Sequence, residues 1–351
     1  MENNLVLNNR DLYVCDPIEI KDTIGSHIEY TLKGNLISDK IIRRYKEFDA
    51  FRNKLSEIYI GLYIPSLPHK QLIGETNKEV VDMRIEMINR FLLKIINLDY
   101  IKNTEEFNLF LTVNNEDIEK VLKKFNTLNY SDLLNKYINI FGDIPKNFNF
   151  EIVKINQQKF VDFLKYNLEK LNTSRKIIKI LKNQFNKNNE SYLSTINMFT
   201  LYEKEILNKL IDENNENKLI FFNPKNVNLC NKITNVQENC LNPYDKLFYS
   251  LTEIILDAES IIETFEKIMK LNETYFKYRI SQKEEEKKYA DSLDKLIYIT
   301  TYQLDLIIQD YKKNCLVNYY KEYGNLLDTF QFNNSIINDF LNEILNNSNL
   351  Y

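Results

Sequence analysis

Residues 43–48 read Arg-Arg-Tyr-Lys-Glu-Phe, two guanidinium groups and an aromatic ring at the end of an expected strand. Further along, residues 64–70 read Ile-Pro-Ser-Leu-Pro-His-Lys, and Arg84 follows within Met83-Arg84-Ile85-Glu86. Planar, bidentate donors suit a phosphomonoester, and a guanidinium supplies them better than an ammonium does. The stretch around Arg44 and Tyr45 therefore predicts a clamp for a phosphate group.

The sequence around this clamp predicts a small α+β domain. Strand-like residues come first, and apolar residues at helical spacing follow them. The expected strands are 12–18, 28–32 and 36–44, and the expected helices are 47–60 and the regions around 83–95 and 107–111. Three strands followed by helices indicate a three-stranded antiparallel meander with helices packed on it.

The remainder of the chain is predicted to be helical. Four of the 6 glycines of the whole chain lie in its first 75 residues, and few glycines or prolines after Pro145 would stop a helix. A first long helix is expected over about 148–216. A second begins near Tyr244, and its apolar stripe is wide enough to need several neighbours, as in a bundle. A charged run at 283–288 interrupts the pattern, so the second hairpin turn is expected within 282–300.

Composition restricts the class of protein. A chain of 351 residues exceeds the usual size of one core, so two domains are expected. The net charge of −4 argues against a nucleic-acid partner. The chain has no long apolar run and no signal-like start, so we expect neither a transmembrane helix nor secretion. Scattered cysteines suit a reducing cytosol.

Enzymatic chemistry finds little support in the sequence. There is no Gly-rich phosphate loop and no nucleophile motif, and the chain has only 2 histidines. No Cys/His pattern for zinc can be assembled. We therefore expect a binding protein without catalytic residues, metal or cofactor.

The motifs resemble a known domain family. Residues of about 10–112 resemble a phox-homology (PX) domain, and the helical remainder resembles a BAR domain. This order is the plan of sorting nexins of the PX–BAR type. The resemblance implies an α+β PX domain followed by an all-α BAR-type domain, a three-helix antiparallel coiled coil. The expected parts are a tail (1–10), the PX domain (11–113), an amphipathic helical linker (114–147) and the BAR-type dimerisation domain (148–351).

The resemblance also implies roles for the clamp residues. In PX domains the position of Arg44 holds the 3-phosphate of a phosphoinositide, and the position of Tyr45 packs on the inositol ring. Lys70 matches the lysine that contacts the 1-phosphate, and Arg84 matches the arginine that bonds the 4- and 5-hydroxyls. The chain has Lys46 where the family often has serine, a position without a headgroup contact.

The loop after the clamp is expected to touch the bilayer. Pro65 and Pro68 stiffen an extended segment, so that Lys70 is held near the pocket. Leu72 and Ile73 follow and are expected to insert into the membrane beside the headgroup.

A PX–BAR plan implies a peripheral membrane protein on the cytosolic face of early endosomes. It would bind phosphatidylinositol 3-phosphate and sense or induce curvature in endosomal cargo sorting and in retrograde or recycling transport. Its implied partners are a second copy or another sorting nexin, and retromer. The alternative is a helical scaffold that links protein partners, with a PX module that does not bind lipid. The net charge of −4 keeps this alternative open.

Two helical features have two interpretations each. Nine basic residues between Lys154 and Lys187 would either face an anionic membrane or form a solvated surface. The amphipathic segment 131–141 would either insert into the bilayer or pack at the PX–BAR junction. Its N-cap is expected at Ser131 or Asp132, and Pro145 is expected to end it.

Overall fold

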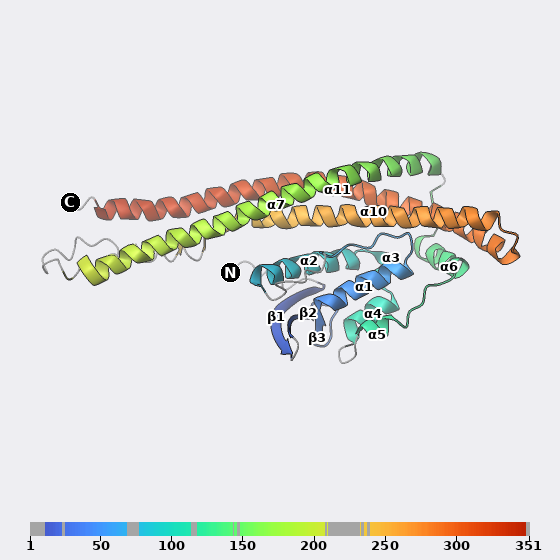
Figure 1. Ribbon diagram of the computed structural model, residues 1–351, viewed down its shortest axis with the longest axis horizontal. Helices are drawn as coiled ribbons and strands as arrows, with labels where there is room; N and C mark the ends of the chain where they lie inside the picture. Colours follow the sequence, from blue (N-terminus) through green and yellow to red (C-terminus); the bar gives the residue numbers. More distant parts are fainter. Residues whose placement is uncertain are drawn as a thin grey trace. The chain divides into compact units, whose positions relative to one another are not determined.

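The computed structural model describes residues 11–22, 25–68, 77–113, 118–142, 144–145, 148–207, 209, 232, 235–236 and 239–348. The described helices and strands are shown in Figure 1. In chain order they are β1 (Tyr13–Asp22), β2 (Gly25–Lys33), β3 (Ile41–Arg44), α1 (Tyr45–Ile58), α2 (Lys78–Ile96), α3 (Asp99–Lys102), α4 (Glu105–Thr112), α5 (Ile118–Leu122), α6 (Tyr130–Phe141), α7 (Phe150–Tyr202), the π-helical turn η3 (Glu203–Leu207), α10 (Asp245–Arg279) and α11 (Glu284–Ser348).

The three strands form an antiparallel meander in the order β1-β2-β3, as predicted. The last strand is shorter than the expected 36–44. Its first part is instead a turn, in which Gly34 has φ +134° and the Leu36 N–H donates to Asp11 O at 3.1 Å. An L side chain rarely adopts that φ, so the turn at Gly34 breaks the strand pattern.

The core of this domain is aromatic. Phe48 and Phe51 on α1 meet Phe107 and Phe110 on α4, and all four are at most 1% exposed. The rings of Phe51 and Phe110 are stacked with centroids 4.2 Å apart. Such rings bury a large apolar area and prefer offset or edge contacts, so they hold α1 against α4. The expected helical spacing of Phe48 and Phe51 is confirmed.

The amphipathic segment is helix α6, and its apolar face is covered by protein. Leu133, Leu134 and Tyr137 are buried, and the Tyr137 hydroxyl donates to Ile60 O at 2.9 Å. These residues belong to the same hydrophobic cluster as the PX-like core. Of the two interpretations, packing at the junction is therefore the arrangement found.

The ends of α6 differ from the prediction. The N-cap is Asn129, whose side-chain oxygen accepts from the Asp132 N–H at 3.0 Å. Ser131 and Asp132 lie inside the first turn, so neither is the N-cap, whose oxygen accepts from the N–H two or three residues further along. The helix ends at Gly142, with φ +63°, rather than at Pro145.

Three long helices, α7, α10 and α11, make up the rest, as predicted. The helix expected over 148–216 starts at Phe150 and passes into η3 after Tyr202, while residues 210–231 lie outside the described part. None of the described helices is both long and apolar enough to cross a membrane.

The chain divides into two compact units. One holds residues 1–171 and 252–315, and the other holds 172–251 and 316–351. In the first unit α7 runs parallel to α11, because Phe150 stacks on Tyr298 and Phe160 meets Tyr311 further along both helices. A hairpin turn makes α10 antiparallel to α11, as expected for a three-helix bundle (Figure 1).

The hairpin turn lies at residues 280–283, so it begins two residues before the expected range 282–300 and overlaps only the first two residues of that range. The charged run 283–288 was expected to interrupt the helical pattern. Instead, α11 begins within this run, at Glu284. Glu284, Glu285 and Glu286 occupy the first turn of that helix. Carboxylates are stabilising there because the unpaired N–H groups carry partial positive charge. The polar run therefore starts a helix rather than a loop.

Each unit has its own apolar core in the helical region. In the first, residues from α7, α10 and α11 share a cluster that includes Leu164, Ala258, Ile261, Leu293 and Ile297. In the second, the cluster comprises Ile196, Val236, Ile336 and Phe340. The wide apolar stripe predicted for α10 is thus shared between two neighbouring helices in the first unit.

The PX-like part of the first unit lies against α10 through ion pairs, with α1 and α2 beside that helix (Figure 1). Lys94 on α2 contacts Glu253 and Asp257, each at 2.7 Å. Arg90 also pairs with Glu253, and Arg52 on α1 pairs with Glu263. Cations of one surface thus face anions of the other.

The pKa values of these carboxylates show how closely they are paired. Burial alone would raise the pKa of Glu263, but hydrogen bonds from Arg52 and Lys267 outweigh it and hold the pKa at about 2. For Asp257, burial prevails over the neighbouring Lys94, and its pKa is raised. Glu263 is therefore a fully charged anion at neutral pH.

Gly61 lies where the backbone of this domain comes close to the long helices. It has φ +81°, and a Cβ there would lie 2.9 Å from Thr300 Cγ2 and 3.3 Å from Leu271 Cδ1. Both the backbone conformation and the absence of space therefore demand glycine at this position.

We expect Gly61→Ala to lower the stability of the chain by about 2 kcal/mol, because it adds a strained φ and a methyl group in a filled space. Thermal unfolding followed by circular dichroism measures the change. Gly324→Ala is the matched control, since nothing lies within 4 Å of a Cβ at that helical glycine. An equal effect of the two substitutions would contradict the close approach at Gly61.

Candidate functional site

The predicted clamp lies where β3 passes into α1. Arg44 is the last residue of β3 and the N-cap of α1, with extended backbone angles (φ −94°, ψ 157°). Its N–H donates to the Glu47 carboxylate at 2.6 Å. Glu47 occupies the third helical position, from which its side chain can reach back to the N-cap. The start of α1 therefore fixes the position of Arg44.

The two adjacent arginines point to opposite faces. Burial alternates along β3, so Arg43 is buried while Arg44 is half-buried. The Arg43 guanidinium donates to Ile42 O at 2.8 Å, to Phe110 O at 2.7 Å and to Val113 O. Burial lowers the pKa of Arg43. Arg43 thus joins β3 to the end of α4 and is not available to a ligand.

Tyr45 and Arg84 are in direct contact. The Arg84 guanidinium carbon lies 4.4 Å from the centroid of the Tyr45 ring, within the range of a cation–π interaction. The Tyr45 hydroxyl donates to Pro68 O in the proline loop, and burial raises its pKa, so it remains a neutral donor. Arg84 is 4% exposed and lies in the second turn of α2.

Three separate elements meet at Tyr45. The β3–α1 junction supplies Arg44 and Tyr45, the proline loop contributes its Pro68 carbonyl, and α2 supplies Arg84. Lys70, Leu72 and Ile73 lie in the segment 69–76, which is outside the described residues.

The electrostatics of the site favour an anion. The Arg44 Nε is buried and has no hydrogen-bond partner within the described residues. A second guanidinium, that of Arg84, is held nearby by Tyr45. Guanidinium groups at a strand end and on a facing helix can bind phosphate oxygens bidentately. The arrangement has the donors that an anionic group would need.

Comparison with known proteins agrees with this architecture. Residues 33–114 match the PX domain family, a range that includes Arg44, Tyr45 and Arg84. The chain also resembles a solved structure described as the SNX-BAR Mvp1 tetramer, with a TM-score of 0.58 and 13% identity over 96% of this chain and 100% of that chain. The chain has the PX–BAR fold of a sorting nexin.

The similar sequences include proteins named sorting nexins. Sorting nexin-30 of Xenopus tropicalis is 31% identical over 125 residues, and sorting nexin 1 of Arabidopsis thaliana is 28% identical over 116 residues. These alignments cover 32% and 30% of this chain and only 28% and 29% of the relatives. The chain therefore matches less than a third of the length of either relative.

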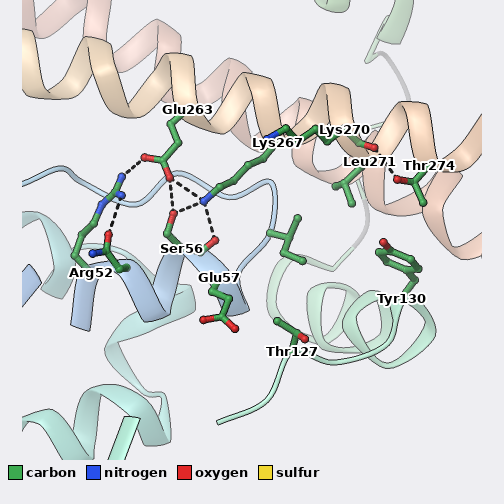
Figure 2. Close-up of a pocket in the computed structure, with 12 residues that line it drawn as sticks. Arg52, Ser56, Glu57, Thr127, Tyr130, Glu263, Lys267, Lys270, Leu271 and Thr274 are labelled. Carbon is green, nitrogen blue, oxygen red and sulfur yellow. Dashed lines mark hydrogen bonds and ion pairs between the residues drawn. The ribbon is translucent and has the colours of Figure 1, made fainter. Parts of the chain in front are cut away.

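A pocket of about 460 Å³ was not anticipated from the sequence. It lies between α1 of the PX domain, the residues that precede and begin α6, and α10. Figure 2 shows Arg52 and Ser56 on one side and Glu263 and Lys267 on the other, joined by hydrogen bonds and ion pairs. The sequence has no signal for this network, because Arg52 and Glu263 are 211 positions apart.

We expect Arg43→Ala to destabilise the PX domain by about 3 kcal/mol, because three carbonyl groups lose a charged donor. Hydrogen exchange of peptides from β1, β2 and α4 measures this local stability in the whole chain. Arg44→Ala removes the neighbouring, half-buried guanidinium and should change the protection by less than about 1 kcal/mol. Equal effects would contradict the division of roles between the two arginines.

Proposed function

We propose that this chain is a peripheral membrane protein that binds phosphatidylinositol 3-phosphate through its PX domain and dimerises through its BAR-type helices. It acts on the cytosolic face of early endosomes, where it senses or induces curvature during cargo sorting and retrograde or recycling transport. The proposed division is the PX domain at 11–113, the helical linker at 114–147 and the BAR-type domain at 148–351. The observation that carries the proposal is the convergence of Arg44, Tyr45 and Arg84.

The proposed headgroup contacts follow the pattern of the PX domain that residues 33–114 match. The Arg44 guanidinium receives the 3-phosphate, because it is half-buried at a strand end and its Nε lacks a described partner. The Tyr45 ring packs on the inositol ring, and Arg84 bonds the 4- and 5-hydroxyls. Lys70 contacts the 1-phosphate, and Leu72 and Ile73 enter the bilayer beside it. A charge-assisted, bidentate contact at Arg44 provides most of the selectivity for phosphate.

Dimerisation is supported by exposed apolar side chains on the long helices. In the first unit, Phe163 and Tyr166 of α7 are 58% and 72% exposed. In the second, Leu316 and Tyr320 of α11 are 59% and 67% exposed. Apolar groups of this size recur along helices that bury them against another chain. The partner is a second copy or another sorting nexin, and retromer is a further partner.

Weak binding at one headgroup site becomes useful in a dimer. Two PX domains on one particle bind a membrane with an effective concentration set by their connection, so that affinity rises without new contacts. Basic residues of α7 add attraction to an anionic surface, at about 1 kcal/mol each when they lie near it. Lys159, Lys176, Lys179 and Lys187 are exposed and suit this role.

Arg44→Ala should reduce pelleting with liposomes that contain phosphatidylinositol 3-phosphate by about tenfold or more, because a charged, bidentate contact is lost. The matched control is Lys46→Ala. Lys46 is exposed, two positions away, and pairs with Glu119 at 3.3 Å on the surface, where such pairs contribute little. Retention of lipid-dependent pelleting by Arg44→Ala would defeat the assignment of the site.

Purified protein should scatter light as a dimer and draw liposomes into tubules visible by electron microscopy. Both results follow from a BAR-type surface made by two chains. A chain that remains monomeric contradicts the proposal directly. A dimer that binds protein partners but never deforms liposomes supports the helical scaffold instead.

A further inference from the structure

Helix α10 of the BAR-type region contacts the proline loop of the PX domain directly. The Ser260 hydroxyl on α10 donates to Ser66 Oγ at 2.7 Å. The Tyr63 hydroxyl, at the start of the loop, donates to Asp257 on the same helix at 2.8 Å. Tyr63 is also buried in the apolar cluster of α7, α10 and α11. The loop that begins at Tyr63 is therefore held by α10 at two points.

Arg52 on α1 joins the same loop to the same helix. Its Nε donates to Pro65 O at 3.4 Å, and its Nη2 donates to Ser66 Oγ at 3.3 Å and to the Glu263 carboxylate. The Arg52 side chain is only 13% exposed. Figure 2 shows the Arg52 guanidinium directed at Glu263 across the gap between α1 and α10. One guanidinium thus holds two successive loop residues and an anion on α10.

Glu263 is in turn held in place by its other neighbours. Its carboxylate accepts from Ser56 Oγ and from Lys267 Nζ, each at 2.8 Å (Figure 2). Lys267 also donates to Ser56 O at 2.9 Å. A carboxylate with this many charged and polar donors has a defined position. Movement of α10 along this surface would therefore move the partner of Arg52.

The far end of the loop reaches the proposed headgroup site. Pro68 O accepts the Tyr45 hydroxyl, and the Tyr45 ring is the one that Arg84 covers. Two prolines restrict the backbone between Tyr63 and Pro68, so the segment transmits a displacement rather than absorbing it. A short, rigid connection thus runs from α10 to Tyr45.

We infer that Arg52 is a positioning residue for headgroup binding, and that it acts by holding the proline loop between the PX domain and α10. Its own partner on the helix is Glu263, while Ser260 bonds the loop directly at Ser66. Headgroup affinity then depends on the BAR-type region even when no membrane or second chain is present. Conversely, a bound headgroup stabilises the contact with α10 by the same free energy as that contact adds to headgroup binding, because coupling between two sites is reciprocal. This inference rests on the proposed function.

The test measures binding of soluble dibutanoyl phosphatidylinositol 3-phosphate to the full chain by calorimetry, so that curvature and avidity do not contribute. Glu263→Gln should weaken binding about fivefold, and Ser260→Ala about twofold, since each removes one contact that holds the loop. The matched control is Glu266→Gln on the same helix. Glu266 pairs with Lys165 at the exposed surface, away from the loop, and its substitution should leave binding unchanged.

A double-mutant cycle separates positioning from a general loss of stability. Arg52→Ala and Glu263→Ala should each weaken binding, and the double variant should bind no more weakly than Arg52→Ala alone, because both act through one contact. Additive losses would overturn the inference. Ser260→Ala keeps the test decisive if the charge variants fold poorly, because it removes a hydroxyl without leaving an unpaired buried charge.

The outcomes distinguish this inference from the proposed function. If the unaltered chain does not bind the soluble headgroup, both are overturned. If the unaltered chain binds, Arg44→Ala does not, and Glu263→Gln and Ser260→Ala bind like the unaltered chain, the headgroup site stands and the role of Arg52 is overturned. Weaker binding by both α10 variants, with Glu266→Gln unaffected, supports it.

Discussion

Charge pairing between the PX domain and α10 is the constraint on which the first unit depends. Three carboxylates on one side of α10 are partly buried, and each is paired with a cation of the PX domain. The carboxylates are Glu253, Asp257 and Glu263, and the cations are Arg52, Arg90 and Lys94. An unpaired charge in such a place costs several kcal/mol, so the two surfaces meet in one register. The close approach at Gly61 follows from that register. The opposite side of α10 is apolar and packs against α7 and α11.

Two neighbouring arginines illustrate how one strand supplies both a residue of the core and a residue of the candidate site. Side chains alternate between the faces of a strand, so Arg43 enters the core while Arg44 is half-buried on the other face. Arg43 satisfies carbonyl groups at the end of α4, and α4 carries the rings that hold α1. The site therefore rests on a residue that cannot itself touch the ligand. The clamp and its support are consecutive in the chain.

Much of the architecture was predictable because it follows from patterns of neighbouring residues in the sequence. The meander, α1 and the long helices follow from alternation, apolar spacing and the scarcity of turn residues. The errors lay at boundaries, where several residues compete for one role. The turn that begins at Gly34 takes up the first residues of the strand expected over 36–44, so β3 starts only at Ile41. Asn129 caps α6 in place of Ser131 or Asp132. The acidic residues after Lys283 began a helix because its N-terminus attracts negative charge.

The sequence by itself predicted the candidate phosphate clamp, because its motifs place Arg44, Tyr45 and Arg84 at spacings that a single domain brings together. It also determined that long helices follow. Only the tertiary structure showed that the apolar face of α6 packs against the core of the PX domain and that Arg52 pairs with Glu263. Those contacts join residues far apart in the chain, and nothing local distinguishes their side chains from ordinary surface charges. Their partners exist only once the PX domain lies against α10.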